Sequence, residues 1–257
     1  MKKAIRAILA VILLAGLIYG VVAVVRQQID YNRGEQEYAE ARSLAGEELD
    51  AAGSGTAGEK TTDPKMWSMA SIHLDNLQQI NPEVVGWIDV PGTVIDYPVL
   101  QTDDNTAYLT KSWKQTDCSV GAIFMECQNR TDLSQFNTIV YGHNMRDGTM
   151  FCGLKEFQDQ SYWYEHRYIY LAGDGVVRKY EIYAAYEVST WEIVYGLEID
   201  SEKRKNEFIE FGLNASQIDA GIVPTADDTI LTLSTCTNQR GGRRWVVQAV
   251  CVDELYH

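Results

Sequence analysis

The sequence has few basic residues, and this excludes one large class of partners. It holds 22 Lys and Arg against 36 Asp and Glu, for a net charge of −14. Residues 1–26 contain four of the cations and no acid, so the rest of the chain carries −18. Nucleic-acid binding needs a basic surface that neutralises phosphates. The chain is therefore not expected to bind DNA or RNA, and its acidic exterior mainly favours solubility.

Cysteine is also scarce, and its spacing fits neither a zinc site nor a disulfide framework. No two cysteines form the short Cys-x-x-Cys clip of structural zinc sites, so we expect no metal. An odd number leaves at least one thiol free. Cys251 lies within the apolar run 246–252 and is expected to be a buried small hydrophobic residue. The five cysteines are Cys118, Cys127, Cys152, Cys236 and Cys251.

The signatures of several other enzyme classes are missing. Gly173-Asp174-Gly175 is typical of a hairpin turn and does not form a phosphate-binding loop. The Cys-x5-Arg loop of tyrosine phosphatases is absent, because the sixth residue after Cys236 is Gly242. The caspase motif is absent, and the order of histidine before cysteine is the reverse of the papain order. There is no internal repeat.

A long apolar run near the N-terminus is the clearest feature that is present. Residues 7–25 are uncharged and would span about 28 Å as a helix, enough to cross the hydrocarbon core. The cations of residues 1–6 outweigh the single Arg26 on the other side, which favours a cytoplasmic N-terminus. We therefore expect a cytoplasmic tail (1–6) and a transmembrane signal anchor (7–25), with the remainder outside the cell. A cleaved signal peptide is the alternative, although its apolar region is usually only about 7–15 residues.

Residues 26–66 are expected to form an extracellular stalk and linker. Residues 27–50 are charged and helix-prone without a firm apolar stripe, and residues 51–58 have the Gly-rich composition of a flexible linker. The next segment has apolar residues at helical spacing, which predicts an amphipathic helix over 67–80. Asn81-Pro82 ends it.

From residue 84 the pattern changes to short β-prone runs. Two helical inserts are expected, at about 150–157 and 201–212. Many short strands with few helices favour a mainly β barrel or sandwich over a βαβ fold, and we assign residues 67–257 to one catalytic domain. The expected strands are 84–90, 94–97, 120–126, 138–142, 168–171, 176–188, 229–235 and 245–252.

Three residue types suited to acyl transfer stand at the ends of these strands. Cys236 ends one strand among polar neighbours, where a nearby cation and imidazole can lower a thiol's pKa. His143 leaves another strand into a polar turn and is a candidate general acid or base. Arg243 and Arg244 open the last strand, where a guanidinium can stabilise an oxyanion. Adjacent strand residues face opposite sides, so only one arginine can face the thiol; the sequence does not separate them.

These segments together resemble the sortases, the membrane-anchored cysteine transpeptidases of Gram-positive bacteria, and specifically class B. Thr232-Leu233-Ser234-Thr235-Cys236 is similar to the family's Thr-Leu-x-Thr-Cys motif, with the serine of class B. Residues 141–145, continuing to 148–151, resemble the class B histidine segment. Residues 85–88, 95–99 and 104–109 resemble its early strands and the loop after them. The resemblance covers about residues 67–252.

The resemblance implies an eight-stranded sortase β-barrel with an N-terminal helical region and a long helix-bearing segment, 189–228, before the cysteine strand. It implies Cys236 as nucleophile, His143 as acid/base and Arg244 as the arginine of the site. The Gly-Gly-Arg-Arg turn departs from the family, and Arg243 could substitute. The residues implied for the substrate groove are Asn105, Ser234 and Thr235.

The resemblance also implies a reaction and its partners. The enzyme would cleave an Asn-Pro-x-Thr-like or related sorting signal, form a thioacyl intermediate and pass it to an amine of the peptidoglycan cross-bridge or lipid II. No cofactor is implied. The alternatives are a pilin-polymerising sortase with a lysine acceptor and an inactive membrane-tethered module that binds sorting signals. A hydrolytic cysteine protease would differ only in its acceptor.

Overall fold

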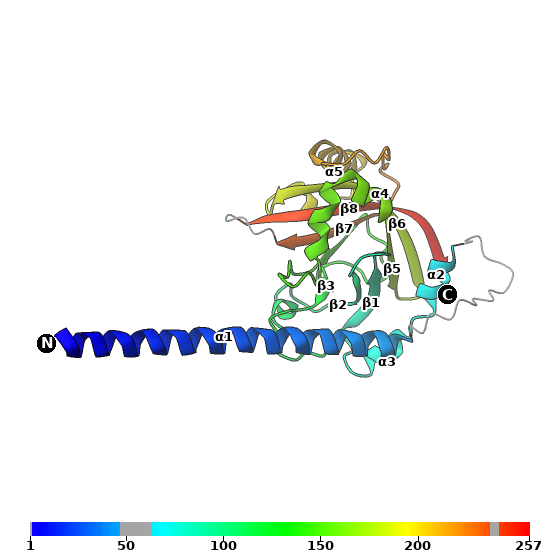
Figure 1. Cartoon of the computed structure of the whole chain (residues 1–257). Coiled ribbons are helices and arrows are strands. Elements are labelled where there is room, and N and C mark those ends of the chain that lie inside the picture. Colours follow the sequence, from blue (N-terminus) through cyan, green and yellow to red (C-terminus); the bar gives the residue numbers. More distant parts are fainter. Residues whose placement is uncertain (1, 47–62, 237–241) are drawn as a thin grey trace.

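A closed β-barrel lies beside one long helix in the computed structural model, which describes residues 2–46, 63–236 and 242–257 (Figure 1). The strand order is β1-β2-β3-β4-β7-β8-β6-β5, and β5 pairs back to β1. The expected linker at 51–58 lies outside the described residues. The described strands are β1 (Val84–Asp89), β2 (Asp96–Leu100), β3 (Ile123–Met125), β4 (Asn137–Tyr141), β5 (Tyr168–Gly173), β6 (Val176–Ser189), β7 (Ile230–Cys236) and β8 (Arg243–Tyr256).

Each strand overlaps one of the predicted β-prone runs, so the prediction of a mainly β barrel is confirmed. Two pairs, β2–β3 and β4–β7, are parallel. A parallel pair needs a long crossover connection. The β4–β7 crossover, residues 142–229, contains β5 and β6 together with the helices η2 (Cys152–Gln158), α4 (Gln160–Glu165), η3 (Ile193–Tyr195) and α5 (Glu202–Ala215).

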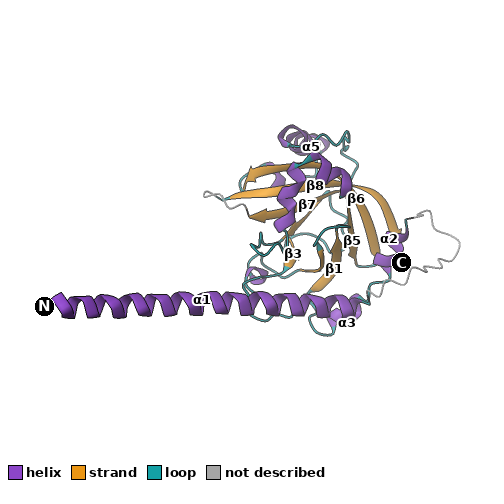
Figure 2. Ribbon diagram, in the orientation of Figure 1, coloured by secondary structure: helices purple, strands orange, loops and turns teal. Residues whose placement is uncertain are grey.

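The helical inserts agree with the sequence only in part. α5 is confirmed. Its N-cap is Ser201, whose hydroxyl accepts the Arg204 N–H, and the helix buries Phe208 and Ile209 on the outside of the barrel (Figure 2). The insert expected at 150–157 is the 3₁₀ helix η2, and a shorter 3₁₀ helix, η1 (Ala107–Leu109), lies earlier in the chain. α4 was not predicted, and its N-cap is Asp159, whose carboxylate accepts two backbone N–H groups.

The single helix predicted over 67–80 is wrong. The structure has two short helices, α2 (Pro64–Ala70) and α3 (Leu74–Gln78). The break between them has a packing reason, because it places His73 and Asn76 against the end of the long helix. The His73 N–H donates to the Ala45 carbonyl at 3.0 Å, and the Asn76 amide donates to the Leu44 carbonyl at 2.9 Å. Both satisfy carbonyls that a helix end leaves without partners.

The long helix α1 (Lys2–Ala45) contains both the apolar run and most of the predicted stalk. Its N-terminal half projects away from the barrel (Figure 1). An 18-residue window of the described helix has a mean hydropathy of 2.4 and is not buried in the protein. By length and composition, this helix can cross a membrane.

The second half of α1 packs on the barrel, and the sequence reasoning missed this. Gly34, Tyr38, Ala41 and Ala45 are buried, and the partly buried Tyr31 packs against the same core. These positions are spaced 3, 4, 3 and 4 residues apart, which is one face of a helix. The stripe was overlooked because it is built from glycine, alanine and tyrosine. The Tyr38 hydroxyl donates to the Gly121 carbonyl at 2.8 Å.

Candidate active site

The predicted cysteine ends β7, and the predicted histidine follows the end of the neighbouring strand β4. The parallel β4–β7 ladder ends with Tyr141 opposite Ser234, 93 residues later in the chain, and Gly142 N donates to the Ser234 carbonyl at 3.2 Å. His143 and Cys236 each follow two residues further on and share that offset. Neighbouring strands lie about 4.8 Å apart. The register therefore brings the backbones of these two residues to the same end of the β4–β7 pair.

The same row continues onto β8 and separates the two arginines. Cys236 pairs with Arg244 in the antiparallel β7–β8 ladder, and directly paired residues project to the same face. Arg243 projects to the other face, where its Nε lies 3.2 Å from Glu187 Oε2 and its Nη2 donates to the Glu187 carbonyl at 3.3 Å. Arg244 is thus the arginine beside the cysteine position. The side chain of Cys236 itself lies outside the described part of the chain.

The row lies on the outer face of the barrel. Along β7, Leu231 and Leu233 belong to the main core, whereas Ile230 belongs to the cluster beneath α5. Alternation therefore places Ser234 and the last residue of β7 outside. The Ser234 hydroxyl is buried, 2.8 Å from the hydroxyl of Tyr195. The helix η3, which carries Tyr195, thus covers one side of the site.

Thr235, expected in the substrate groove, lies on the opposite face. It pairs with Trp245, which belongs to the main core, and it is 2% exposed. Within the described residues its Oγ1 has no hydrogen-bond partner. The structure therefore brings Ser234, but not Thr235, to the face that carries the row.

Asn105 joins the site through a carboxylate that the sequence reasoning overlooked. The Asn105 amide nitrogen lies 2.7 Å from both carboxylate oxygens of Glu126, and its amide oxygen accepts the Cys127 N–H at 2.8 Å. Glu126 is 5% exposed and also accepts the Tyr141 hydroxyl at 2.8 Å. Burial and this carboxylate raise the pKa of Tyr141, which therefore remains a hydroxyl donor. The only sequence signal was a carboxylate directly after the apolar run 123–125.

His143 is held from two sides. Its Nε2 lies 2.7 Å from the carbonyl oxygen of Leu109, and a carbonyl can only accept, so Nε2 carries a proton in this arrangement. Nδ1 is then the nitrogen left for proton exchange. The ring packs on Gly121, which has φ +67°; a Cβ there would lie 2.6 Å from His143 Cδ2. Gly121 therefore gives the ring the space it occupies.

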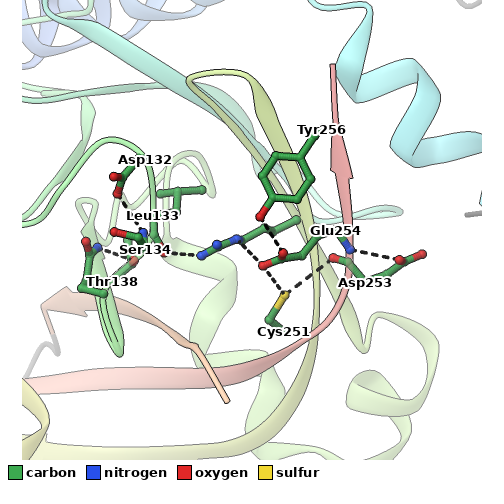
Figure 3. Close-up of polar contacts among 10 residues, drawn as sticks. Asp132, Leu133, Ser134, Thr138, Cys251, Asp253, Glu254 and Tyr256 are labelled. Carbon is green, nitrogen blue, oxygen red and sulfur yellow. Dashed lines mark hydrogen bonds and ion pairs between the residues drawn. The ribbon is translucent and has the colours of Figure 1, made fainter. Parts of the chain in front are cut away.

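Three thiols outside the site have a raised pKa, which makes them less reactive because less of the thiolate is present. Burial raises the pKa of Cys118, and burial together with Glu126 raises that of Cys127. Cys251 is partly buried against the core, and burial raises its pKa to about 11. Figure 3 shows Cys251 beside Asp253 and Glu254. Its Sγ lies 3.6 Å from the Asp253 carbonyl oxygen and 3.8 Å from Glu254 Oε1. It lies seven residues along β8 from Arg244, roughly 23 Å away.

No cluster of three or more His, Cys, Asp or Glu side chains that could hold a metal ion occurs in the described ranges.

Comparison with known proteins agrees with this architecture. Residues 88–252 match the sortase domain family. The chain is 32% identical over 183 residues to sortase B of Listeria monocytogenes, covering 70% of this chain and 74% of that protein. The structure of sortase B from B. anthracis superposes with a TM-score of 0.70 at 30% identity, covering 88% of this chain and 99% of that one. A Staphylococcus aureus sortase B–substrate complex gives a TM-score of 0.66 at 30% identity, with 70% and 84% covered. The chain belongs to the sortase family, and within it to the class B cysteine transpeptidases.

Proposed function

We propose that this chain is a membrane-anchored sortase that cleaves a C-terminal sorting signal through Cys236 and attaches the surface protein to a cell-wall amine. The observation that carries the proposal is the register of β4, β7 and β8, which pairs Cys236 with Arg244 and brings His143, two residues beyond the end of β4, to the same end of β7. A nucleophile with an acid/base on one side and a fixed cation on the other supplies the groups that acyl transfer requires.

The first half of the reaction forms a thioester. The Cys236 thiolate attacks the backbone carbonyl carbon of the threonine in an Asn-Pro-x-Thr-like signal, and the Arg244 guanidinium stabilises the resulting oxyanion. The C–N bond then breaks. His143, as the imidazolium, gives a proton through Nδ1 to the leaving amine, and the C-terminal tail departs.

The second half transfers the acyl group. An incoming amine attacks the thioester carbon, His143 takes up the amine's proton and the C–S bond breaks to regenerate the thiolate. A sortase B has been solved in complex with a peptide of three glycines, which offers a free amine. This supports an amine of the peptidoglycan cross-bridge or lipid II as the acceptor here. We assign Asn105 and Ser234 to the groove that binds the signal.

We further propose a single-pass topology with a cytoplasmic N-terminus and an extracellular catalytic domain. The support is the apolar part of α1 together with the cations that precede it. Anchoring by a membrane-spanning helix would hold the enzyme close to membrane-bound substrates and raise their effective concentration.

The test is thioester trapping by mass spectrometry with a soluble sorting-signal peptide. Wild-type protein is expected to gain the mass of the acyl fragment on Cys236, and Cys236→Ala is expected to gain none. Cys251→Ala is the matched control and should be acylated like wild type. Adding a short glycine peptide should convert the product from the free acid to the amide. An adduct that persists in Cys236→Ala would refute the assignment.

A further inference from the structure

Helix α1 contacts the barrel along a line that begins very close to the end of its apolar run. Asp30 is among the first residues of this line, with its carboxylate accepting the Ser119 hydroxyl at 3.3 Å. Glu37 then binds the Trp113 indole N–H through its carbonyl oxygen at 2.7 Å, and Glu40 pairs with Lys114 at 2.5 Å. Contacts continue to Ala45, so this half of α1 is fixed to the barrel.

The helical rise converts these contacts into heights above the membrane. The last apolar residue of the predicted span is Val25, and α1 continues from it without interruption. At 1.5 Å per residue, Asp30 lies about 8 Å beyond it and Ala45 about 30 Å beyond it. The polar headgroup layer is itself roughly 5–8 Å thick on each side of the hydrocarbon core. The barrel therefore begins where the headgroups end.

The loop that follows His143, residues 144–147, lies beside the part of α1 that comes directly after the apolar run. A cleft of about 440 Å³ separates α1 from this loop, with Gln27, Asp30 and Tyr31 on the helix side and Asn144, Met145 and Arg146 on the loop side. The residues directly after His143 thus lie opposite the first turn and a half of helix beyond the apolar run. Arg146 is exposed there.

The catalytic end of the barrel faces the same way. In Figure 1 the end of β7 and the start of β8 lie on the side toward which the N-terminal half of α1 projects, and the C-terminus lies at the opposite end. β6 ends at Ser189, which pairs with Arg243. Trp191 follows two residues later and is 93% exposed. Tryptophan favours the membrane–water interface, where its ring is partly apolar and its N–H remains hydrated.

Charge alone would not bring this domain to a membrane. The chain beyond Arg26 carries −18, which an anionic lipid surface repels. A flexible tether would therefore let the domain stand away from the bilayer, whereas a continuous helix docked on the barrel does not.

We propose that α1 is a rigid spacer that holds the catalytic end of the barrel against the outer headgroup layer, with the 144–147 loop and Trp191 in contact with lipid. This inference rests on the proposed anchoring and deepens it: the site would act on sorting signals that emerge at the membrane surface. The partner is the bilayer in which the chain's own helix is inserted.

The main test inserts seven helix-forming residues after Arg26 in the full chain, reconstituted in vesicles of phosphatidylethanolamine and phosphatidylglycerol. Seven residues raise the domain by about 10 Å and nearly preserve its rotational orientation. Cleavage of a soluble signal peptide is expected to stay unchanged, whereas cleavage of the same signal on a lipid anchor should fall by about tenfold, because the two sites no longer meet. A flexible Gly/Ser insert of equal length is the matched control and should retain more activity on the anchored signal.

The outcomes separate this inference from the proposed function. If wild type cleaves neither substrate, the proposed function fails. If the helical insert leaves cleavage of the anchored signal unchanged, or slows both substrates equally, the spacer role is overturned. A second measurement locates Trp191 directly: headgroup-nitroxide lipids should quench a component of tryptophan emission that Trp191→Phe lacks. Equal quenching of the two proteins would show that Trp191 does not reach the headgroups.

Discussion

Gly121→Ala should disable the site through the histidine ring. Gly121 has φ +67°, and a Cβ built on it lies 2.6 Å from His143 Cδ2 and 2.7 Å from the Tyr108 carbonyl oxygen. The carbonyl belongs to the backbone and cannot rotate away. The ring must therefore shift to make room, and with it the hydrogen bond from Nε2 to Leu109.

The magnitude has two parts. Ordinary carbon–carbon contacts are about 3.5–4.0 Å, so the ring has to move by roughly 1 Å. A displacement of that size in a reacting group lowers the rate by about 10²-fold. Separately, a non-glycine residue in the left-handed region destabilises the fold by roughly 1–3 kcal/mol. We therefore expect both a lower kcat/KM for signal-peptide cleavage and a lower Tm.

Gly148→Ala separates the effect of ring displacement on the rate from the effect of backbone strain on stability. Gly148 lies in the same loop as His143 with φ +88°, and a Cβ there meets nothing within 4 Å. It should lose no more stability than Gly121→Ala and keep a kcat/KM within about threefold of wild type, because backbone strain is added without a clash. Steady-state cleavage and thermal unfolding of both variants make the comparison. Equal kcat/KM values for the two alanine variants would refute the packing of His143 on Gly121.

Three further predictions concern neighbouring groups. Arg244→Ala should lower kcat by about 10²–10³-fold, as removal of an oxyanion donor does. Arg243→Ala should change stability by at most about 1 kcal/mol and leave kcat close to wild type, because the partly exposed ion pair of Arg243 with Glu187 is weak. Similar kcat values for these two variants would contradict the β7–β8 register. A pKa raised to about 11 keeps Cys251 protonated below that pH, so iodoacetamide at pH 8 should modify Cys236 first and Cys251 only as the pH approaches 11, as read by peptide mapping. Glu126→Leu removes the acceptor shared by an amide and a tyrosine hydroxyl and should raise KM and lower stability by about 1–3 kcal/mol; an unchanged KM would exclude a role in the groove.

The strands could be read from the sequence because their residues are intrinsically suited to a sheet. The run Thr138–Tyr141, for example, consists of β-branched and aromatic residues and ends at a polar turn. What the sequence could not supply was their pairing. The parallel contact between β4 and β7 joins residues 93 positions apart, and no local pattern specifies which strands become neighbours.

The site was predicted at the level of its chemistry and not of its geometry. Strand alternation implied that only one arginine could face the thiol, and the family resemblance pointed to Arg244; the β7–β8 register gives a geometric reason for that choice. The same alternation could have placed Thr235 on the opposite face from Ser234, because the two are consecutive in one strand. Glu126 and Tyr195 carried no motif; each becomes visible only through the partner it touches.

The docking of α1 was missed for a different reason. Apolar periodicity is usually recognised through large aliphatic residues, but this stripe contains glycine, alanine and tyrosine instead. Gly34 allows close approach, because a Cβ there would lie 3.0 Å from Val120. The break between α2 and α3 depended on the same contact, since His73 and Asn76 bind carbonyl groups at the end of α1.

Disulfide formation between residues 143 and 236 tests the central geometry most directly. Two cysteines bridge when their Cα atoms are about 4.4–6.8 Å apart, which is the separation of aligned residues on neighbouring strands. His143→Cys should therefore form a bridge to Cys236 under mild oxidation, identified by peptide mapping, whereas His166→Cys, at the end of α4, should not. Failure of the first variant to bridge residue 236, with the protein folded, would contradict the row on which the mechanism depends.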